Sequence, residues 1–159
     1  MAIATDTTET ALKKFFVLCS EILREEILRA FAYLGEQCVN AARLPHDNNW
    51  NDITGNLRSS IGYAVYEEGK TQIQSAFDLV KNGTQGQTEG KRMVEELAGK
   101  YADTYALVVL AGMDYASYVE SKDNRDVLAS ASLKASSKMQ EYMNKAVERA
   151  VARINKLQI

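Results

Sequence analysis

Apolar residues recur at every third or fourth position along two long stretches of this chain, one toward each end. The first stretch runs from about residue 8 to residue 43, and its apolar stripe consists of Leu12, Phe16, Cys19, Leu23, Ile27, Ala30, Leu34, Cys38 and Ala41. This spacing predicts one face of an amphipathic α-helix, and the only proline, Pro45, follows where the pattern stops. Such a helix would be roughly 50 Å long, so we expect part of it to project or to pack on another subunit.

A second apolar set widens the stripe of this helix beyond one face, and its members are Phe15, Leu18, Ile22 and Phe31. This width is typical of a helix that is buried on two sides or that contacts another subunit, and both interpretations stay open.

The second long stretch covers residues 126 to 157, with apolar positions at Leu128, Ala131, Ala135, Met139, Tyr142, Met143, Ala146, Ala150 and Ile154. It predicts a long C-terminal helix.

Shorter patterns lie between these two helices. Residues 45 to 55 are polar and predict a loop that contains Trp50. Residues 56 to 80 predict a hairpin region, in which Ile61 to Glu67 alternate between two faces, residues 68 to 70 turn, and residues 71 to 80 return. Residues 81 to 90 contain no apolar residue and predict a mobile loop, residues 91 to 101 predict a short helix, and residues 105 to 112 predict a buried central strand.

This order of elements predicts an α+β fold. We expect a small antiparallel sheet of three to four strands, packed by the long N-terminal and C-terminal helices, with a short helix between strands. A length of 159 residues suits a single domain over residues 1–159. The first ten residues carry no basic and apolar leader pattern, and no apolar run reaches about 18 residues, so neither a signal peptide nor a membrane span is predicted.

The composition gives little support to catalysis. The chain has one histidine and two cysteines, so we predict no cofactor, no metal and no enzymatic activity. His46 lies beside Asp47 and Asp52, but a single histidine lacks the further ligands of a zinc site, and a surface histidine is the simpler interpretation. Cys19 and Cys38 lie roughly 28 Å apart on one helix, too far for a disulfide, and the apolar surroundings of Cys38 are expected to raise its pKa.

The charges are nearly balanced, with 19 Lys and Arg against 21 Asp and Glu, so any DNA contact would be local. Adjacent carboxylates point apart on a helix or strand, so Glu25 with Glu26, Glu67 with Glu68 and Glu95 with Glu96 are predicted to be solvated charges. A basic stripe follows the C-terminal helix at Lys134, Lys138, Lys145, Arg149, Arg153 and Lys156. The stripe would face nucleic acid or an acidic partner, or it would face solvent and pair with Glu141 and Glu148.

Two short segments carry a resemblance to a known family. The segment from Trp50 to Ile61 has an aromatic residue, then Thr-Gly, then Leu-Arg-x-Ser-Ile at the entry to a strand, and its matching residues include Trp50, Thr54, Gly55, Leu57, Arg58 and Ser60. The segment from Asp114 to Glu120 has a Tyr-Ala-x-Tyr-Val-Glu pattern, with matches at Tyr115, Tyr118 and Glu120. Together they resemble the tail-component proteins of long-tailed bacteriophages and prophages, which act in head-to-tail joining and tail completion.

The resemblance implies a structural virion protein that forms a ring through protein–protein contacts. The implied partners are other copies of the chain, head-connector proteins, and tail-tube or tail-terminator proteins, with no membrane and no small-molecule substrate. The implied location is the neck or tail of the virion, after synthesis in the cytoplasm of the host bacterium. The matching residues would then mark an assembly interface.

The matching residues also have a physical interpretation of their own. Gly55 permits a turn with positive φ, Thr54 is placed to cap the turn beginning at Asn56, and Leu57 points inward. Arg58 is a hypothetical partner of Glu120, and two independent surface charges are the alternative. Trp50 would be a local core residue or an interface anchor.

Docking surfaces and a second function also follow from these patterns. Exposed strand edges and the long helix offer repeated contacts for ring neighbours, and the loop over residues 81–90 and the loop around Trp50 are expected to become ordered on docking. The alternative function is a small regulatory or nucleic-acid-binding module that uses the basic stripe.

Overall fold

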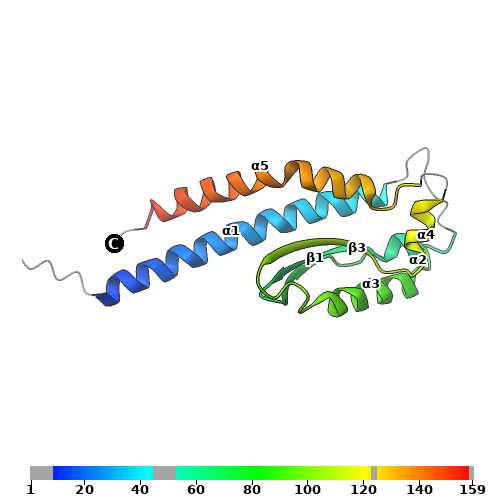
Figure 1. Cartoon of the computed structure of the whole chain (residues 1–159), viewed down its shortest axis with the longest axis horizontal. Helices are drawn as coiled ribbons and strands as arrows, with labels where there is room; N and C mark the ends of the chain where they lie inside the picture. Colours follow the sequence, from blue (N-terminus) through cyan, green and yellow to red (C-terminus); the bar gives the residue numbers. More distant parts are fainter. Residues whose placement is uncertain (1–8, 45–52, 123–124, 158–159) are drawn as a thin grey trace, which may run out of the picture.

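The computed structural model describes residues 9–44, 53–122 and 125–157, which adopt the predicted α+β fold. The helices of this part are α1 (Glu9–Arg43), α2 (Asn56–Ser59), α3 (Thr84–Leu97), α4 (Ala116–Ser121) and α5 (Ala129–Ile154). The strands are β1 (Ile61–Glu67), β2 (Lys70–Gln74) and β3 (Tyr105–Ala111). Figure 1 shows α5 lying along α1, the sheet packed on α1, and α3 covering the other face of the sheet.

The sheet is antiparallel with the order β2-β1-β3, so β1 is its central strand. The prediction that the strand over residues 105–112 is central is therefore wrong, since β3 is an edge strand and is only partly buried. Strand β1 suits the centre because both of its faces are apolar. Tyr63 and Val65 pack toward α1, whereas Ala64 and Tyr66 pack in the cluster beneath α3.

The second strand of the hairpin is shorter than the predicted range of residues 71–80, because β2 ends at Gln74. After it, the Ser75 side chain is buried and its hydroxyl accepts a hydrogen bond from the Tyr63 amide at 3.0 Å. Phe77 then takes a positive φ of 55°, and its ring is 1% exposed in the cluster beneath α3. The chain therefore leaves the sheet to bury Phe77.

The segment over residues 81–90 is mostly helical, so the prediction of a mobile loop there is wrong. Helix α3 begins at Thr84 and ends at Leu97, earlier at both ends than the predicted helix over residues 91–101. The buried face of its N-terminal half carries Gly86 and Gly90, and the buried apolar residue Val94 follows in the C-terminal half. A Cβ atom on Gly86 would lie 1.8 Å from the Asn56 carbonyl oxygen, and one on Gly90 would lie 2.5 Å from the Phe77 ring. In this part of α3 the helix backbone therefore packs directly against Asn56 and Phe77, and no apolar side chains are needed for the contact.

The two long helices confirm the periodicity analysis closely. Helix α1 has 35 residues, and α5 starts three residues after the predicted position 126. Gly35 of α1 lies against Tyr63, whose ring a Cβ atom would meet at 2.5 Å. Cys38 is buried and donates to the Ala131 carbonyl at 3.5 Å, and burial raises the pKa of its thiol as expected. Among the described helices, none is long and apolar enough to cross a membrane.

Candidate functional site

The described part of the first segment of the resemblance, residues 53–61, contains a tight turn and the short helix α2. Gly55 has φ 88°, as predicted, and the Thr54 hydroxyl accepts a hydrogen bond from the Asn56 amide at 3.3 Å. Leu57 and Ser60 are buried, and the Ser60 hydroxyl donates to the Leu57 carbonyl at 2.8 Å. Most of this segment therefore holds the entry to β1 in place.

The second segment of the resemblance includes α4 and leaves its aromatic side chains at the surface. Tyr115 is 41% exposed and Tyr118 is 64% exposed. The Glu120 carboxylate accepts hydrogen bonds from the amides of Leu128 at 3.0 Å and Ala129 at 2.7 Å, so it caps the start of α5. The hypothetical pair of Arg58 with Glu120 is wrong, because no ion pair joins these two described residues and Glu120 binds the N-terminus of α5 instead.

Two residues of the basic stripe bind a buried carboxylate of the same chain. The Glu26 side chain is 1% exposed and accepts from Arg149 Nε at 2.8 Å and Arg153 Nη1 at 2.9 Å. Arg29 lies 3.2 Å away, and the second terminal nitrogen of Arg153 donates to Glu25 at 2.7 Å. The hydrogen bond from Arg149 is the main cause that lowers the pKa of Glu26. We call this group the ion cluster.

The ion cluster and a second ion pair overturn two predictions of solvated carboxylates. Glu26 is fully buried, and its place between Ile22 and Ala30 in an i, i+4 series was a signal that it lies on the apolar face of α1. Glu67 is half-buried and accepts from Arg24 Nε at 2.8 Å and from the Tyr105 hydroxyl at 2.7 Å. Both carboxylates join α1 to another element.

The rest of the basic stripe lies nearer to solvent. Lys145 pairs with Glu141 at 2.5 Å, as predicted, and both side chains are more than half exposed. Lys134 is exposed and Lys138 is half-buried. Binding to Glu26 thus occupies Arg149 and Arg153, whereas Lys134 and Lys156 at the two ends of the stripe are exposed.

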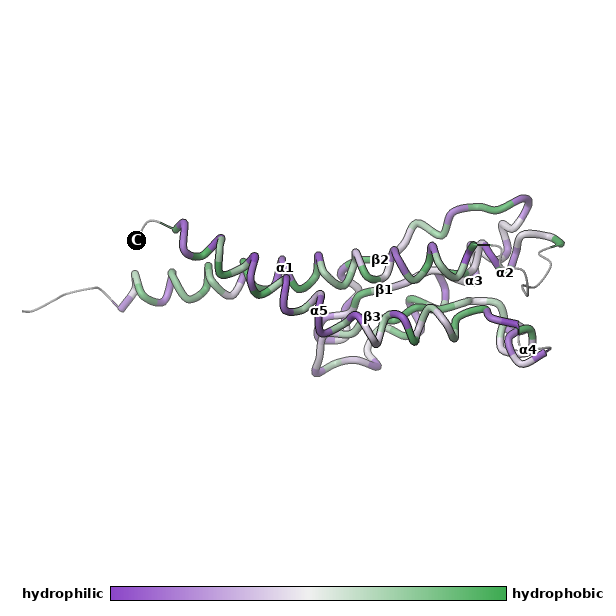
Figure 2. Tube along the Cα trace, turned by 90° about the horizontal axis from the view of Figure 1, so that it is seen from above, coloured by the Kyte–Doolittle hydropathy of each residue, from purple (hydrophilic) through white to green (hydrophobic). Residues whose placement is uncertain are grey.

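Helices α1 and α5 continue together beyond the end of the sheet, as Figure 1 shows. Apolar side chains stay exposed along this projecting part, and Figure 2 shows green positions among purple ones there. We define the projecting apolar face by six exposed residues, Leu12, Phe16, Val17, Leu23, Val147 and Val151.

This face continues the side of α1 that is buried elsewhere. Phe16 and Leu23 stand at i and i+7 in a helical series that reaches Leu34 at i+18, and Leu34 is 1% exposed in the core. The same helical side is therefore covered over the sheet and uncovered beyond it. The expected projection of the helix is confirmed. Ile22 and Phe31 are buried, whereas Leu18 is 41% exposed.

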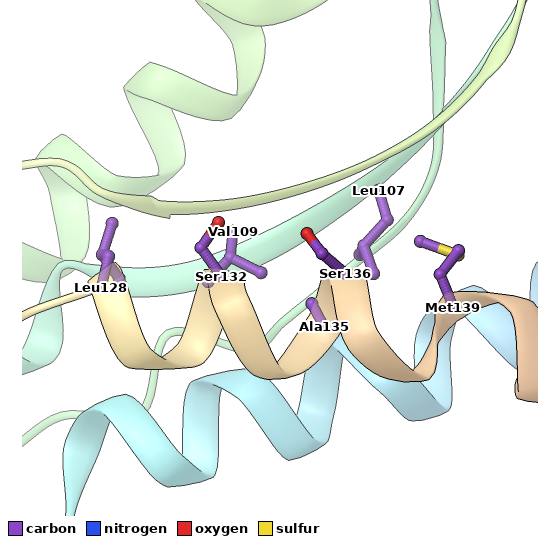
Figure 3. Close-up of a pocket in the computed structure, with 7 residues that line it drawn as sticks. All are labelled: Leu107, Val109, Leu128, Ser132, Ala135, Ser136 and Met139. Carbon is purple, nitrogen blue, oxygen red and sulfur yellow. The ribbon is translucent and has the colours of Figure 1, made fainter.

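A groove follows the outer edge of β3. Its volume is about 380 Å³, and Leu107 and Val109 of β3 line it opposite the side chains of α5. Figure 3 shows Leu128, Ser132, Ala135, Ser136 and Met139 along the α5 wall. Within the described sheet, β3 pairs only with β1, so its other edge has no strand partner.

The residues of the hypothetical hydrolytic site, His46, Asp47 and Asp52, lie outside the described residues, and Trp50 does too. In the part of the chain that the structure describes, no three His, Cys, Asp or Glu side chains gather in a way that would hold a metal ion. No family model matches the chain, and no curated protein or solved structure matches it either. The surfaces described above are therefore the basis of the proposals that follow.

Proposed function

We propose that this protein is a structural component of a tailed-phage virion that joins head to tail or completes the tail. It acts by forming a ring through protein–protein contacts with its own copies and with connector and tail proteins. The observation that carries this proposal is the projecting apolar face, whose six side chains are 37% to 59% exposed. The resemblance of the segments around Gly55 and Tyr118 supports the same conclusion.

The projecting apolar face has the properties of a protein interface. Phe16 and Val17 on α1 are 59% and 57% exposed, and Val151 on α5 is 49% exposed. Large apolar side chains gathered on one surface are typical of a site that another protein covers. The ion cluster fixes α5 against α1 in this region, so the face is presented by a preformed pair of helices.

The strand edges offer a second kind of contact. In the described sheet, β2 and β3 each have one edge without a strand partner. The groove beside β3 is lined on α5 by Leu128, Ala135 and Met139 together with two serines, so an extended segment that pairs with the edge would place side chains in the groove. Different surfaces on one copy allow head-to-tail contacts, and these close into rings when the rotation permits.

Disruption of the gene in a phage genome that carries it tests the proposal. We expect negative-stain electron microscopy of the lysate to show filled heads beside separate tails. Intact, infectious virions would contradict the function. Complementation sharpens the test: the double variant Phe16→Ser, Val151→Ser should fail to restore joined particles. The matched control Leu79→Ser, Leu133→Ser removes exposed apolar side chains outside the face and should restore them.

The nucleic-acid alternative has less support, because Arg149 and Arg153 of its basic stripe already bind Glu26. It predicts binding to random duplex DNA that weakens steeply as salt rises. Such binding by the purified chain, together with intact virions after gene disruption, would favour the alternative.

A further inference from the structure

A second groove lies between α1 and α5 and combines aromatic with cationic side chains. Its volume is about 310 Å³, and its lining is Arg29, Ala30, Tyr33, Tyr142, Lys145 and Arg149. The rings of Tyr33 and Tyr142 pack with centroids 5.4 Å apart, and Lys145 Nζ lies 5.8 Å from the Tyr142 centroid. We call this site the tyrosine groove. Its side chains suit a ligand that has both a carboxylate and an aromatic ring.

One cation of the tyrosine groove, Arg149, has donor groups that no described residue uses. Arg29, Lys145, Arg149 and Arg153 pair there with Glu25, Glu26 and Glu141, and Glu148 is also close enough to help raise the pKa of Lys145. Arg149 uses only its Nε on Glu26, and its terminal nitrogens have no hydrogen-bond partner among the described residues. Because Arg149 lines the groove and is 44% exposed, these nitrogens are available to one incoming carboxylate.

A carboxylate and exposed tyrosines that would complement the tyrosine groove lie elsewhere on the same chain, in the segment that leads into α4. Asp114 is exposed and makes no hydrogen bond or ion pair with any described residue. Tyr115 and Tyr118 beside it are 41% and 64% exposed. Figure 1 shows α4 at one end of the domain, opposite the end where α1 and α5 project beyond the sheet. The segment that leads into α4 and the tyrosine groove between α1 and α5 are therefore separate surfaces.

We propose that the tyrosine groove of one copy binds the segment from Asp114 to Tyr118 of a second copy. The Asp114 carboxylate pairs with the cations of the groove, and an exposed tyrosine packs on Tyr33 and Tyr142. Because the two surfaces differ, the contact is head-to-tail and repeats from copy to copy. The inference rests on the proposed ring-forming function and names the contact between its subunits.

The groove suits a single carboxylate better than a nucleic acid. A phosphate backbone would bring successive charges past Glu141 and Glu25, whose side chains are 58% and 53% exposed beside the groove. The chain as a whole carries a net charge of -2, which repels a polyanion further. The unused terminal nitrogens of Arg149 match the single carboxylate of Asp114.

Charge reversal on the two sides of the contact tests the proposal. The variants Asp114→Lys and Lys145→Glu are made singly and together in the full chain, and self-association is measured by sedimentation velocity at increasing concentration. Each single variant should weaken association about tenfold or more, and the double variant should restore it to within about threefold. The controls Asp103→Lys and Lys100→Glu make the same charge changes at exposed positions away from both surfaces and should match the wild type.

Concentration-dependent NMR shifts of the wild-type chain provide a second measurement that needs no variant. Signals of Tyr33 and Lys145 should move together with those of Asp114 and Tyr118. The proposal is overturned if the wild-type chain stays monomeric at about 1 mM, or if the single variants associate as the wild type does. It is also overturned if the double variant is no better than the weaker single one. Shifts at Tyr33 and Lys145 on adding a DNA oligonucleotide, without self-association, would assign the groove to nucleic acid instead.

The two proposals fail in different ways. Normal association of both single variants, with separated heads and tails after gene disruption, would reject the groove contact and leave the assembly function standing. Rescue by the double variant, with intact virions after gene disruption, would support the contact and reject the function.

Discussion

Arg149 Nε lies 2.8 Å from Oε2 of Glu26, and this hydrogen bond joins the two longest helices of the described chain through a buried carboxylate. Burying a carboxylate is costly unless cations and hydrogen bonds offset the lost hydration. Arg153 supplies the second strong donor, and its side chain is 40% exposed. The arginines therefore keep much of their own hydration while they satisfy Glu26.

Replacing Glu26 tests how strongly this cluster holds the helices together. We expect Glu26→Ala to lower the free energy of unfolding by about 2–3 kcal/mol, because it removes the acceptor shared by Arg149 and Arg153. Glu25→Ala is the matched control and should cost less than about 1 kcal/mol, since its ion pair with Arg153 is exposed. Urea denaturation followed by circular dichroism measures both values. Equal losses for the two variants would argue against the ion cluster.

The stability of the fold should also decrease in acid. The hydrogen bond from Arg149 lowers the pKa of Glu26 below its ordinary value of 4.5, so the unfolded chain binds a proton there more readily than the folded chain. The stabilisation is fully present above about pH 5 and is lost as the pH falls through the pKa of the folded state. The Glu26→Gln variant should show a weaker decrease of unfolding free energy between about pH 5 and pH 3. Parallel pH profiles would contradict this assignment.

At Gly86 on the buried side of α3, we expect replacement by alanine to change stability in the direction opposite to the one that helix propensity gives. In an exposed helix, Gly→Ala is stabilising by about 1 kcal/mol. At Gly86 the new Cβ atom would lie 1.8 Å from the Asn56 carbonyl oxygen, so we expect Gly86→Ala to be destabilising by about 2–3 kcal/mol. Thr88→Ala, at an exposed position of the same helix, should be neutral or slightly stabilising. A stabilised Gly86→Ala variant would show that α3 does not pack closely on α2.

Tyr66 tests the core beneath α3. Its hydroxyl donates to the Val94 carbonyl at 2.8 Å, and burial raises the pKa of Tyr66 to about 12. Tyr66→Phe leaves that carbonyl without its donor, so thermal unfolding should show a loss of about 1–1.5 kcal/mol. Tyr118→Phe should leave stability unchanged because Tyr118 is 64% exposed. A neutral Tyr66→Phe variant would mean that water replaces the lost hydrogen bond.

The elements that sequence analysis predicted well are those whose own side chains determine burial. Helix α1 and strand β1 follow their apolar periods to within a residue of the predicted bounds. Helix α3 was predicted to begin too late because its N-terminal half packs through Gly86 and Gly90 and has no apolar stripe there. A periodicity test cannot detect a contact that depends on the absence of a side chain.

Pairings between distant residues were the least predictable part of the candidate site. Glu26 and Arg149 are 123 positions apart, and only the packing of α5 on α1 brings them together. The same applies to Glu120, which was expected beside Arg58 but caps α5 through the Leu128 and Ala129 amides. The exposure of Tyr115 and Tyr118 likewise depends on where α4 lies on the body of the domain.

Helix α1 runs without interruption from the projecting tip into the core, so one element spans regions of very different local stability. Amides near Leu34 are buried against the sheet and should exchange with solvent only when the whole domain unfolds. The first turns of α1 lie beyond the end of the sheet, so fraying from the N-terminal end of this helix should expose their amides far more often. A neighbour that covers the tip would suppress this fraying, and slowed hydrogen exchange at the first turns of α1 would report assembly at single-residue resolution.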